Sequence, residues 1–394
     1  MKHKTWSASA SWSASASWSA STSMIRVLGL IVLGGLFLAA RPVPAQIECP
    51  LPAGVMPPAD PRVTAQQVEN GSATLMDFAL AVREHNSEIS RLESSSELLA
   101  YLGCRSRQEG SPYRSGSTYL VLLTPEGRIS VHTQNMALSG RRLNPSIYGA
   151  ILKAVGIDPA RLADPTAAVA AFTAAAAGNG GAVDLPEIPG ASGYAFVYLS
   201  PSFRIPLLML AGFNLNESHM AQEEIDYGNP AVAARDVVDR ETLKAFVREA
   251  GDYFVALQES GDLAATAKAR IALRDPNGPW RHGSVYLYIL YTEANVILFH
   301  GAFPDRFELR PLTPTIRDVV TGEFILPKVI DAAKSNPEGG FVEYYFDDPS
   351  DATDSADIPK VGYARMFTGT LQRPDGSAVP LSYIIGSGFS ASGF

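Results

Sequence analysis

The residues best suited to chemistry gather in the last third of the chain, where aromatic and cationic side chains recur in runs with strand character. Tyrosine offers an apolar ring with a hydroxyl group, and Lys or Arg can pair with a carboxylate. A neutral histidine adds a contact through its imidazole. Such a set suits a small organic acid or an amino acid. The candidate ligand-binding residues are Tyr286, Tyr288, His300, Tyr344, Lys360, Tyr363 and Arg365.

Strand geometry decides which of these side chains can share a face. Side chains alternate between the two faces of a strand, so Tyr286 and Tyr288 share one face of a strand over 284–291. Tyr363 and Arg365 share a face of a later strand. The binding hypothesis further requires Tyr344 and Tyr363 to lie on the same side of one curved sheet. In the alternative, the tyrosines pack against a helix, Arg365 is a solvated strand residue and backbone groups satisfy His300.

The segment 339–388 supplies the sheet that must position these groups. Three strand-like runs, 339–346, 360–367 and 382–388, are separated by turn-forming residues, which predicts an antiparallel meander. Between the first two runs lies an acidic excursion. Its aspartates could bind calcium, but their spacing does not match an EF-hand loop, so we favour a solvated loop and expect no metal site. They are Asp347, Asp348, Asp351, Asp354 and Asp357.

The chain also contains an internal repeat. Thr242-Leu243 with Phe246, Ser284 to Leu287, and His300 each echo an earlier segment at nearly equal offsets of 167 or 168 positions. The earlier segments are Thr74-Leu75 with Phe78, Ser117 to Leu120, and His132. This predicts an α+β protein built from two tandem units, each a long N-terminal helix packed on an antiparallel sheet. We expect the first unit at 63–215, a connector at 216–238 and the second unit at 239–394. The first looks pared down, without the second unit's extra strand and excursion, so His132 is interpreted as structural.

The second unit resembles the Cache superfamily of extracytoplasmic sensor domains, and the first resembles it weakly. The resemblance is carried, in order, by Gly261-Asp262-Leu263, Leu273-Arg274-Asp275, 286–290, Phe299-His300, 340–346, 359–363 and 384–388. It implies two PAS-like, Cache-like units and a role in binding or sensing a small molecule. Members of the family often have Pro after the histidine, where this chain has Gly301. They often continue into a membrane helix and a signalling domain, whereas this sequence ends at Phe394.

We therefore expect an exported small-molecule-binding protein of Cache type without its own signalling output. Its expected partners are a carboxylate-bearing metabolite and a membrane-bound signalling protein that reads out binding. The alternatives are a structural or protein-interaction module that has lost its pocket, or an unrecognised enzyme. No G-x-S-x-G, H-E-x-x-H, P-loop or C-x-x-C motif occurs, so we expect neither enzymatic activity nor a cofactor. The formal net charge of −8 argues against nucleic-acid binding.

The N-terminal region predicts export to the periplasm or the medium. Residues 1–23 form a low-complexity tract, interpreted as a start-site artefact or a disordered extension. Residues 24–45 have the pattern of a signal peptide that is cleaved after Ala45, and the alternative is an uncleaved membrane anchor. Cleavage would leave a mature chain without a transmembrane span, beginning with a Pro-rich lead-in at 46–62. The two cysteines, Cys49 and Cys104, favour a disulfide in an exported chain over two buried free thiols.

Overall fold

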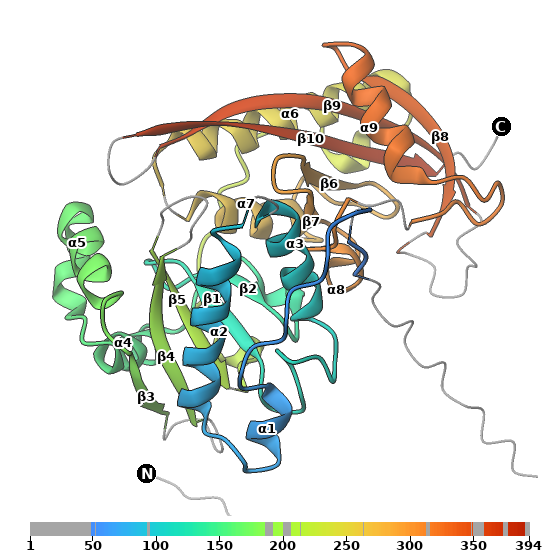
Figure 1. The fold of residues 1–394 in the computed structure, drawn as a ribbon. Coiled ribbons are helices and arrows are strands. Elements are labelled where there is room, and N and C mark those ends of the chain that lie inside the picture. Colours follow the sequence, from blue (N-terminus) through green and yellow to red (C-terminus); the bar gives the residue numbers. More distant parts are fainter. Residues whose placement is uncertain are drawn as a thin grey trace, which may run out of the picture. The chain divides into compact units, whose positions relative to one another are not determined.

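The computed structural model describes residues 49–51, 53–92, 95–185, 192–199, 206–212, 214–262, 264–312, 316–347, 349, 358–372 and 377–390. The predicted extension and signal peptide lie outside this range. The chain from Gln46 to Phe394 forms one compact unit. Within it we call 63–215 module one and 239–394 module two, and Figure 1 shows their helices and sheets.

Each module contains a five-stranded antiparallel sheet, and the two sheets have the same strand order. Sheet one runs β2-β1-β5-β4-β3 and sheet two runs β7-β6-β10-β9-β8. The strands of sheet one are β1 (Leu120–Leu123), β2 (Ile129–His132), β3 (Gly181–Asp184), β4 (Ser192–Leu199) and β5 (Pro206–Gly212). Those of sheet two are β6 (Tyr286–Tyr291), β7 (Val296–His300), β8 (Gly340–Phe346), β9 (Ile358–Gln372) and β10 (Ala378–Ser390). The predicted α+β class with two tandem PAS-like units is confirmed.

In each module, helices precede the first strand and also lie between the second and third strands in the sequence. Those of module one are α1 (Ala65–Glu69), α2 (Leu75–Ile89), α3 (Ser95–Arg105), α4 (Pro145–Ala154) and α5 (Pro165–Ala175). Those of module two are α6 (Arg240–Glu259), α7 (Ala265–Arg274), α8 (Pro304–Phe307) and α9 (Ile325–Ser335). Short 3-10 turns are η1 (Met136–Leu138), η2 (Pro159–Ala163), η3 (Glu217–His219) and η4 (Ala234–Asp236). The long helix α6 is capped at its N-terminus by Asp239, whose side chain accepts the Thr242 backbone N–H.

The internal repeat extends to the backbone hydrogen bonding of the sheets. In the β1–β2 hairpin Val121 pairs with His132, and in the β6–β7 hairpin Tyr288 pairs with His300. Both hairpins shift register at the same place, between Leu122 and Leu123 in module one and between Ile289 and Leu290 in module two. A shared β-bulge is a specific feature. The two modules are therefore copies of one structural unit.

The expectation of a pared-down first copy is wrong in one respect. Residues Gly181–Asp184 form β3, which pairs antiparallel with β4 and completes the sheet as β8 does in module two. This strand was not apparent from the sequence because it has only four residues, and its first and last residues, Gly181 and Asp184, are of types that are typical of turns.

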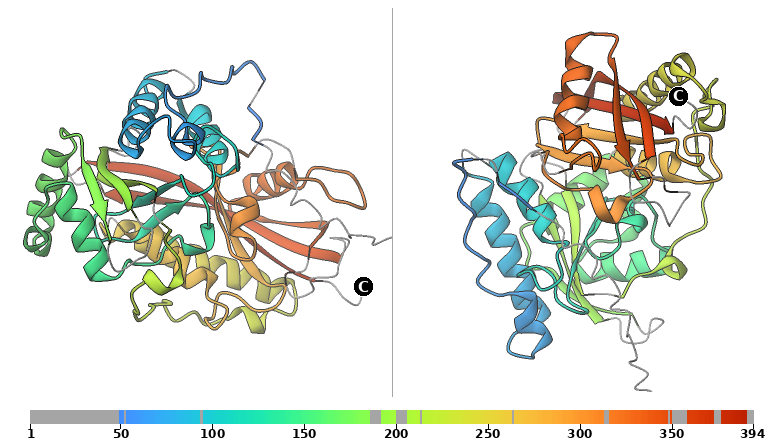
Figure 2. Two further views of the ribbon diagram at one scale, coloured as in Figure 1. Left: turned by 90° about the horizontal axis from the view of Figure 1, so that it is seen from below. Right: turned by 90° about the vertical axis from the view of Figure 1, so that its right-hand side faces the viewer.

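Both faces of each sheet are covered by apolar packing, and Figure 2 shows the layers from two further sides. In sheet one, one face packs on α2 and α3 and the other on α4 and α5. In sheet two, one face packs on α6 and the other on α8 and α9. We call these last two the α6 face and the α9 face. Their assignment decides which side chains can meet in a cavity.

The predicted disulfide joins Cys49 and Cys104, 55 positions apart. It ties the N-terminal lead-in to the last turn of α3, and the alternative of two free thiols is wrong. Within the described ranges, no helix combines the length and the apolar content that a membrane span requires.

Candidate functional site

Five of the seven predicted residues meet on the α9 face of sheet two. Tyr286 and Tyr288 project from β6, His300 from the end of β7, Tyr344 from β8 and Lys360 from β9. Tyr286, Tyr288, His300 and Tyr344 line a cavity of about 50 Å³, and Lys360 packs against its aromatic wall. The remaining walls are apolar side chains of β6, β7, α8, the segment before α9, α9 and β8: Leu290, Ile297, Phe307, Ile316, Ile325, Leu326, Val329 and Phe346.

Tyr363 and Arg365 lie on the opposite face, so the expectation that Tyr344 and Tyr363 share one side of the sheet is wrong. Tyr363 is 2% exposed and belongs to the core cluster of the α6 face. Its ring lies 4.9 Å from that of Phe341, and its hydroxyl donates to a backbone carbonyl. The Arg365 Nε donates to the Pro337 carbonyl at 3.1 Å. Tyr363 follows the helix-packing alternative, whereas Arg365 is held by the Pro337 carbonyl and is only 25% exposed, so it is not the solvated residue of that alternative.

The register of β9 explains this division. Tyr344 pairs with Lys360, and three residues farther along β9 Tyr363 pairs with Phe341. Side chains an odd number of positions apart on a regular strand point to opposite faces. Lys360 therefore shares the α9 face with Tyr344, while Tyr363 and Arg365 share the α6 face with each other, as their even spacing predicts.

His300 is held as a neutral imidazole with a defined tautomer. Its Nδ1 accepts the Phe303 backbone N–H at 3.1 Å, as the backbone-satisfied alternative predicts. The proton of the neutral ring is therefore on Nε2. Burial, reinforced by the nearby Lys360 ammonium, lowers the pKa of His300 to about 3. The residue thus offers one N–H donor at neutral pH.

The Lys360 ammonium lies against two aromatic side chains that line the cavity. The residue is 3% exposed, and its Nζ lies 5.0 Å from the centroid of the Tyr286 ring and 6.0 Å from that of Phe346. Aromatic faces stabilise a cation at such distances. No acidic residue is among the described residues that line the cavity.

The Tyr288 hydroxyl is buried and has no hydrogen-bond partner among the residues that the structure describes. Burial raises its pKa well above the ordinary value, so it stays protonated. Gly386 makes room for the ring, because a Cβ there would lie 2.3 Å from the Tyr288 Oη. A buried unpaired hydroxyl costs free energy unless a ligand or water completes it.

The corresponding face of module one is filled. Val121 takes the place of Tyr288 and pairs with Leu210 across β1 and β5, where module two pairs Tyr288 with Gly386. Apolar side chains of α4 and α5, including Phe172, complete that core. His132 keeps the local motif of His300, since its Nδ1 accepts the Asn135 N–H at 3.0 Å. Burial lowers the pKa of His132 to about 4.

A buried ionic cluster beside the cavity was not predicted from the sequence. Glu308 is 0% exposed and pairs with Arg274 at 2.5 Å and with Arg270 at 4.0 Å. Its Oε1 also accepts the His300 backbone N–H at 3.0 Å. These residues come from segments that are distant in the sequence, so no local sequence motif predicts that they form a cluster.

The same arginines join the modules through backbone carbonyls. Arg270 donates to Ser130 O, and Arg274 donates to Ser139 O at 3.0 Å. In the other direction Arg107 of module one donates to Pro304 O at 3.3 Å. The cavity of module two is therefore adjacent to the contact between modules.

Among the described residues, no three His, Cys, Asp or Glu side chains lie close enough together to bind a metal ion. Asp347 accepts from Arg306 at 3.0 Å. The other aspartates considered for calcium, Asp348, Asp351, Asp354 and Asp357, lie outside the described residues.

Comparisons with known proteins do not assign this chain to a family. No protein-family model and no curated protein matches the chain. Among solved structures, a methyl-accepting chemotaxis protein from Vibrio parahaemolyticus is similar, at 20% identity and a TM-score of 0.29. The match covers 38% of this chain and 86% of that one. An overlap this limited supports no functional assignment.

Proposed function

We propose that the protein is an exported small-molecule-binding protein of sensor type, and that module two binds a small carboxylate-bearing metabolite. The observation that carries this proposal is a convergence of donors. The Tyr288 hydroxyl and the neutral His300 line one cavity, and the Lys360 ammonium lies 5.0 Å from the centroid of the Tyr286 ring in its wall. No acidic residue is among the described residues that line it. The resemblance of module two to Cache domains supports a sensing role, with a membrane-bound protein reading out the bound state. The disulfide supports an extracytoplasmic location.

A carboxylate would complete the groups that the cavity presents. Its oxygens would accept from the Lys360 Nζ, the Tyr288 hydroxyl and the His300 Nε2–H, and charge-assisted hydrogen bonds of this kind are the stronger ones. The Tyr286 and Tyr344 rings would cover the apolar part of the molecule. The low pKa of His300 keeps that residue a neutral donor, so the net charge of the donor set comes from Lys360.

The cavity volume limits the size of the ligand. About 50 Å³ accommodates one or two waters at roughly 30 Å³ each, or an acid of very few carbons. Because α9 closes the cavity through Leu326 and Val329, a larger acid requires α9 to move. Small acids are therefore the first to test.

The test is a thermal-unfolding panel on the full chain with formate, acetate, propionate, lactate, pyruvate and glycine at pH 7. We expect at least one acid to raise Tm. The stabilisation follows RT ln(1 + [L]/Kd), about 2.7 kcal/mol at 100 times Kd. Lys360→Met should abolish the shift and Tyr288→Phe should reduce it.

Arg365→Met is the matched control, because Arg365 lies on the same strand as Lys360 but on the α6 face. It should leave the ligand-induced shift unchanged. The proposal fails if no acid in the panel shifts Tm, or if the shift survives Lys360→Met.

The small cavity favours one alternative, an interaction module whose pocket has closed. In that case replacing Lys360 by Met would leave the response to every acid flat and would keep or raise the stability, since burying a charge is costly. The same panel separates the two functions.

A further inference from the structure

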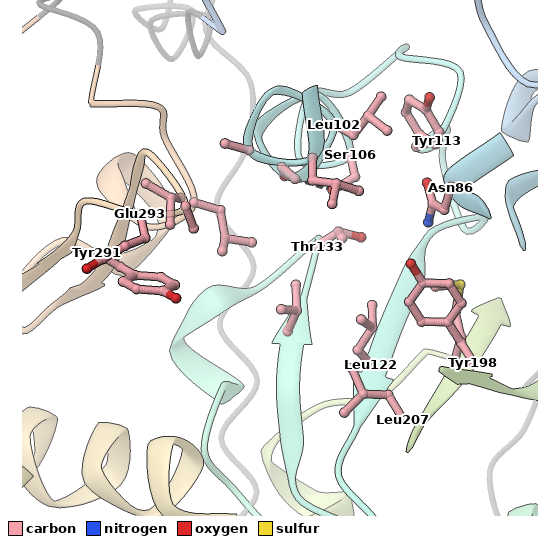
Figure 3. A pocket seen from close by; sticks show the side chains of 18 of the residues that line it. Asn86, Leu102, Ser106, Tyr113, Leu122, Thr133, Tyr198, Leu207, Tyr291 and Glu293 are labelled. Atoms are coloured by element: carbon pink, nitrogen blue, oxygen red, sulfur yellow. Dashed lines mark hydrogen bonds between the residues drawn. The ribbon is translucent and has the colours of Figure 1, made fainter. Parts of the chain in front are cut away.

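A second and larger cavity lies elsewhere in the compact unit. It has a volume of about 440 Å³, within the roughly 300–1,000 Å³ of small-molecule sites. Figure 3 shows it between α3 and sheet one on one side and the β6–β7 turn on the other. It opens on the α2 and α3 face of module one, so it is distinct from the cavity beside Lys360.

The walls of this cavity are predominantly apolar and belong to both modules. Leu122 of β1 pairs directly with Val131 of β2 and with Met209 of β5, and all three line the floor. Leu102 of α3 and Leu309 of module two line the walls. Leu122 and Val131 are only partly buried, although Leu122 lies on a strand that has a neighbour on each side. Apolar surface is therefore left uncovered inside the fold.

Leu309 holds an uncommon backbone conformation at the edge of this cavity. Its φ is +61°, a region that a bulky residue rarely adopts, and its N–H donates to the Ile297 carbonyl at 2.8 Å. Such conformations persist where the surrounding structure enforces them, and they concentrate at ligand sites. Leu309 is thus fixed as part of the wall.

Polar side chains line the cavity on both sides, and Ser106 and Thr133 lie between them in Figure 3. Asn86, Tyr113 and Tyr198 lie along one side in Figure 3, and Glu293 lies on the other. The Tyr113 and Tyr198 hydroxyls have no hydrogen-bond partner among the residues that the structure describes. By contrast, the Thr133 hydroxyl donates to Leu120 O at 2.8 Å. A ligand would thus find donors and acceptors on the tyrosine side.

The charge of the lining selects against anions. No Lys, Arg or His is among the described residues that line the cavity. Its one ionisable carboxylate, Glu293, is exposed at the rim and already accepts the Ser382 N–H at 3.1 Å. A carboxylate or phosphate inside would have no counter-charge, and burying an unpaired charge is costly.

We propose that this cavity binds a neutral, largely apolar small molecule that carries one hydrogen-bonding head, such as an alcohol, ketone or ester, at Tyr198 and Asn86. The apolar body lies over Leu122, Val131 and Met209. This site occupies a different cavity from the carboxylate site proposed for module two, and neither proposal rests on the other.

N-phenyl-1-naphthylamine, a neutral dye that fluoresces in apolar surroundings, is the probe for this site. With the full chain at pH 8 we expect saturable fluorescence that decan-1-ol displaces and decanoate does not. Val131→Phe fills the cavity and should weaken dye binding at least 10-fold. Val319→Phe is the matched control, because Val319 is 57% exposed and lines none of the described cavities. It should bind the dye as the unaltered chain does.

Tyr198→Phe tests the polar end without depending on the filled variant. It removes a hydroxyl that makes no hydrogen bond to a described residue, so the fold should be retained, as a thermal melt will show. Losing one hydrogen bond should raise the Kd of decan-1-ol about 2- to 10-fold and leave dye affinity within 2-fold. The proposal is overturned by absent or non-saturable fluorescence, or by equal displacement with decanoate. It is also overturned by unchanged alcohol affinity in Tyr198→Phe, or by unchanged dye affinity in folded Val131→Phe.

Discussion

Replacing Glu308 by Gln tests the buried ionic cluster that holds the two modules together. The substitution keeps the shape of the side chain and the oxygen that accepts the His300 N–H, but removes the charge that faces Arg270 and Arg274. The side chains of Glu308, Arg270 and Arg274 are 0%, 4% and 11% exposed. Leaving such arginines without a counter-charge costs about 3–5 kcal/mol, and we expect Glu308→Gln to lose that much stability.

The assay is urea unfolding of the full chain with linear extrapolation to water. Trp280 is a natural reporter of module two, because it is 1% exposed and its indole N–H donates to Tyr227 O at 2.9 Å. Glu217→Gln serves as the control, since Glu217 pairs with Arg141 at the surface and is 66% exposed. Such pairs contribute less than about 1 kcal/mol.

Combining Glu308→Gln with Arg274→Met shows whether the charges act together. If they do, the double variant loses less stability than the two single variants summed, because the second change removes a charge that the first left unpaired. A loss below about 1 kcal/mol for Glu308→Gln, or additive losses in the double variant, would refute the reasoning.

Three further predictions concern the disulfide, the buried histidine and the tyrosine layer. Replacing Cys49 and Cys104 by Ser opens a loop of 55 positions and should lower the unfolding free energy by roughly 4 kcal/mol in urea titrations; an unchanged midpoint would contradict this. His300 has a folded pKa of about 3, below its ordinary 6.5, so its contribution is complete above pH 6.5 and is lost as pH falls towards 3. In urea titrations from pH 7 to 4.5, His300→Gln should flatten the decline by up to about 1.4 kcal/mol per pH unit, and equal slopes would count against it. Gly386→Ala should cost about 1–3 kcal/mol because its Cβ meets the Tyr288 hydroxyl, and calorimetry should find a smaller cost in a Tyr288→Val background.

The sequence was sufficient to predict the repeated architecture. Residues such as His132 and His300 recur at a constant offset because each occupies the same place in its hairpin, beside the same β-bulge. The capping aspartate at 239 and the tyrosine pair of β6 also follow local rules of helix capping and strand alternation. Signals of this kind depend on neighbours in the chain, so a single sequence contains them.

The composition of the site could be predicted only in part. Strand alternation already separates Lys360 from Tyr363, since they are three positions apart, and this parity was the available signal for dividing the predicted set. Which face carries the cavity depends on where α6 and α9 pack, which is a long-range outcome. Glu308 and its arginines lie beyond any local pattern for the same reason.

Three successive residues after β7 face three different surroundings. Phe307 lines the small cavity of module two, Glu308 contacts the buried arginines, and Leu309 lines the large cavity. The three side chains therefore belong to one short backbone stretch, and the hydrogen bond from the Leu309 N–H to Ile297 O anchors that stretch to β7. A rotation of this short stretch would alter the volume of both cavities and the geometry of the ion pair together, so none of the three can be adjusted alone.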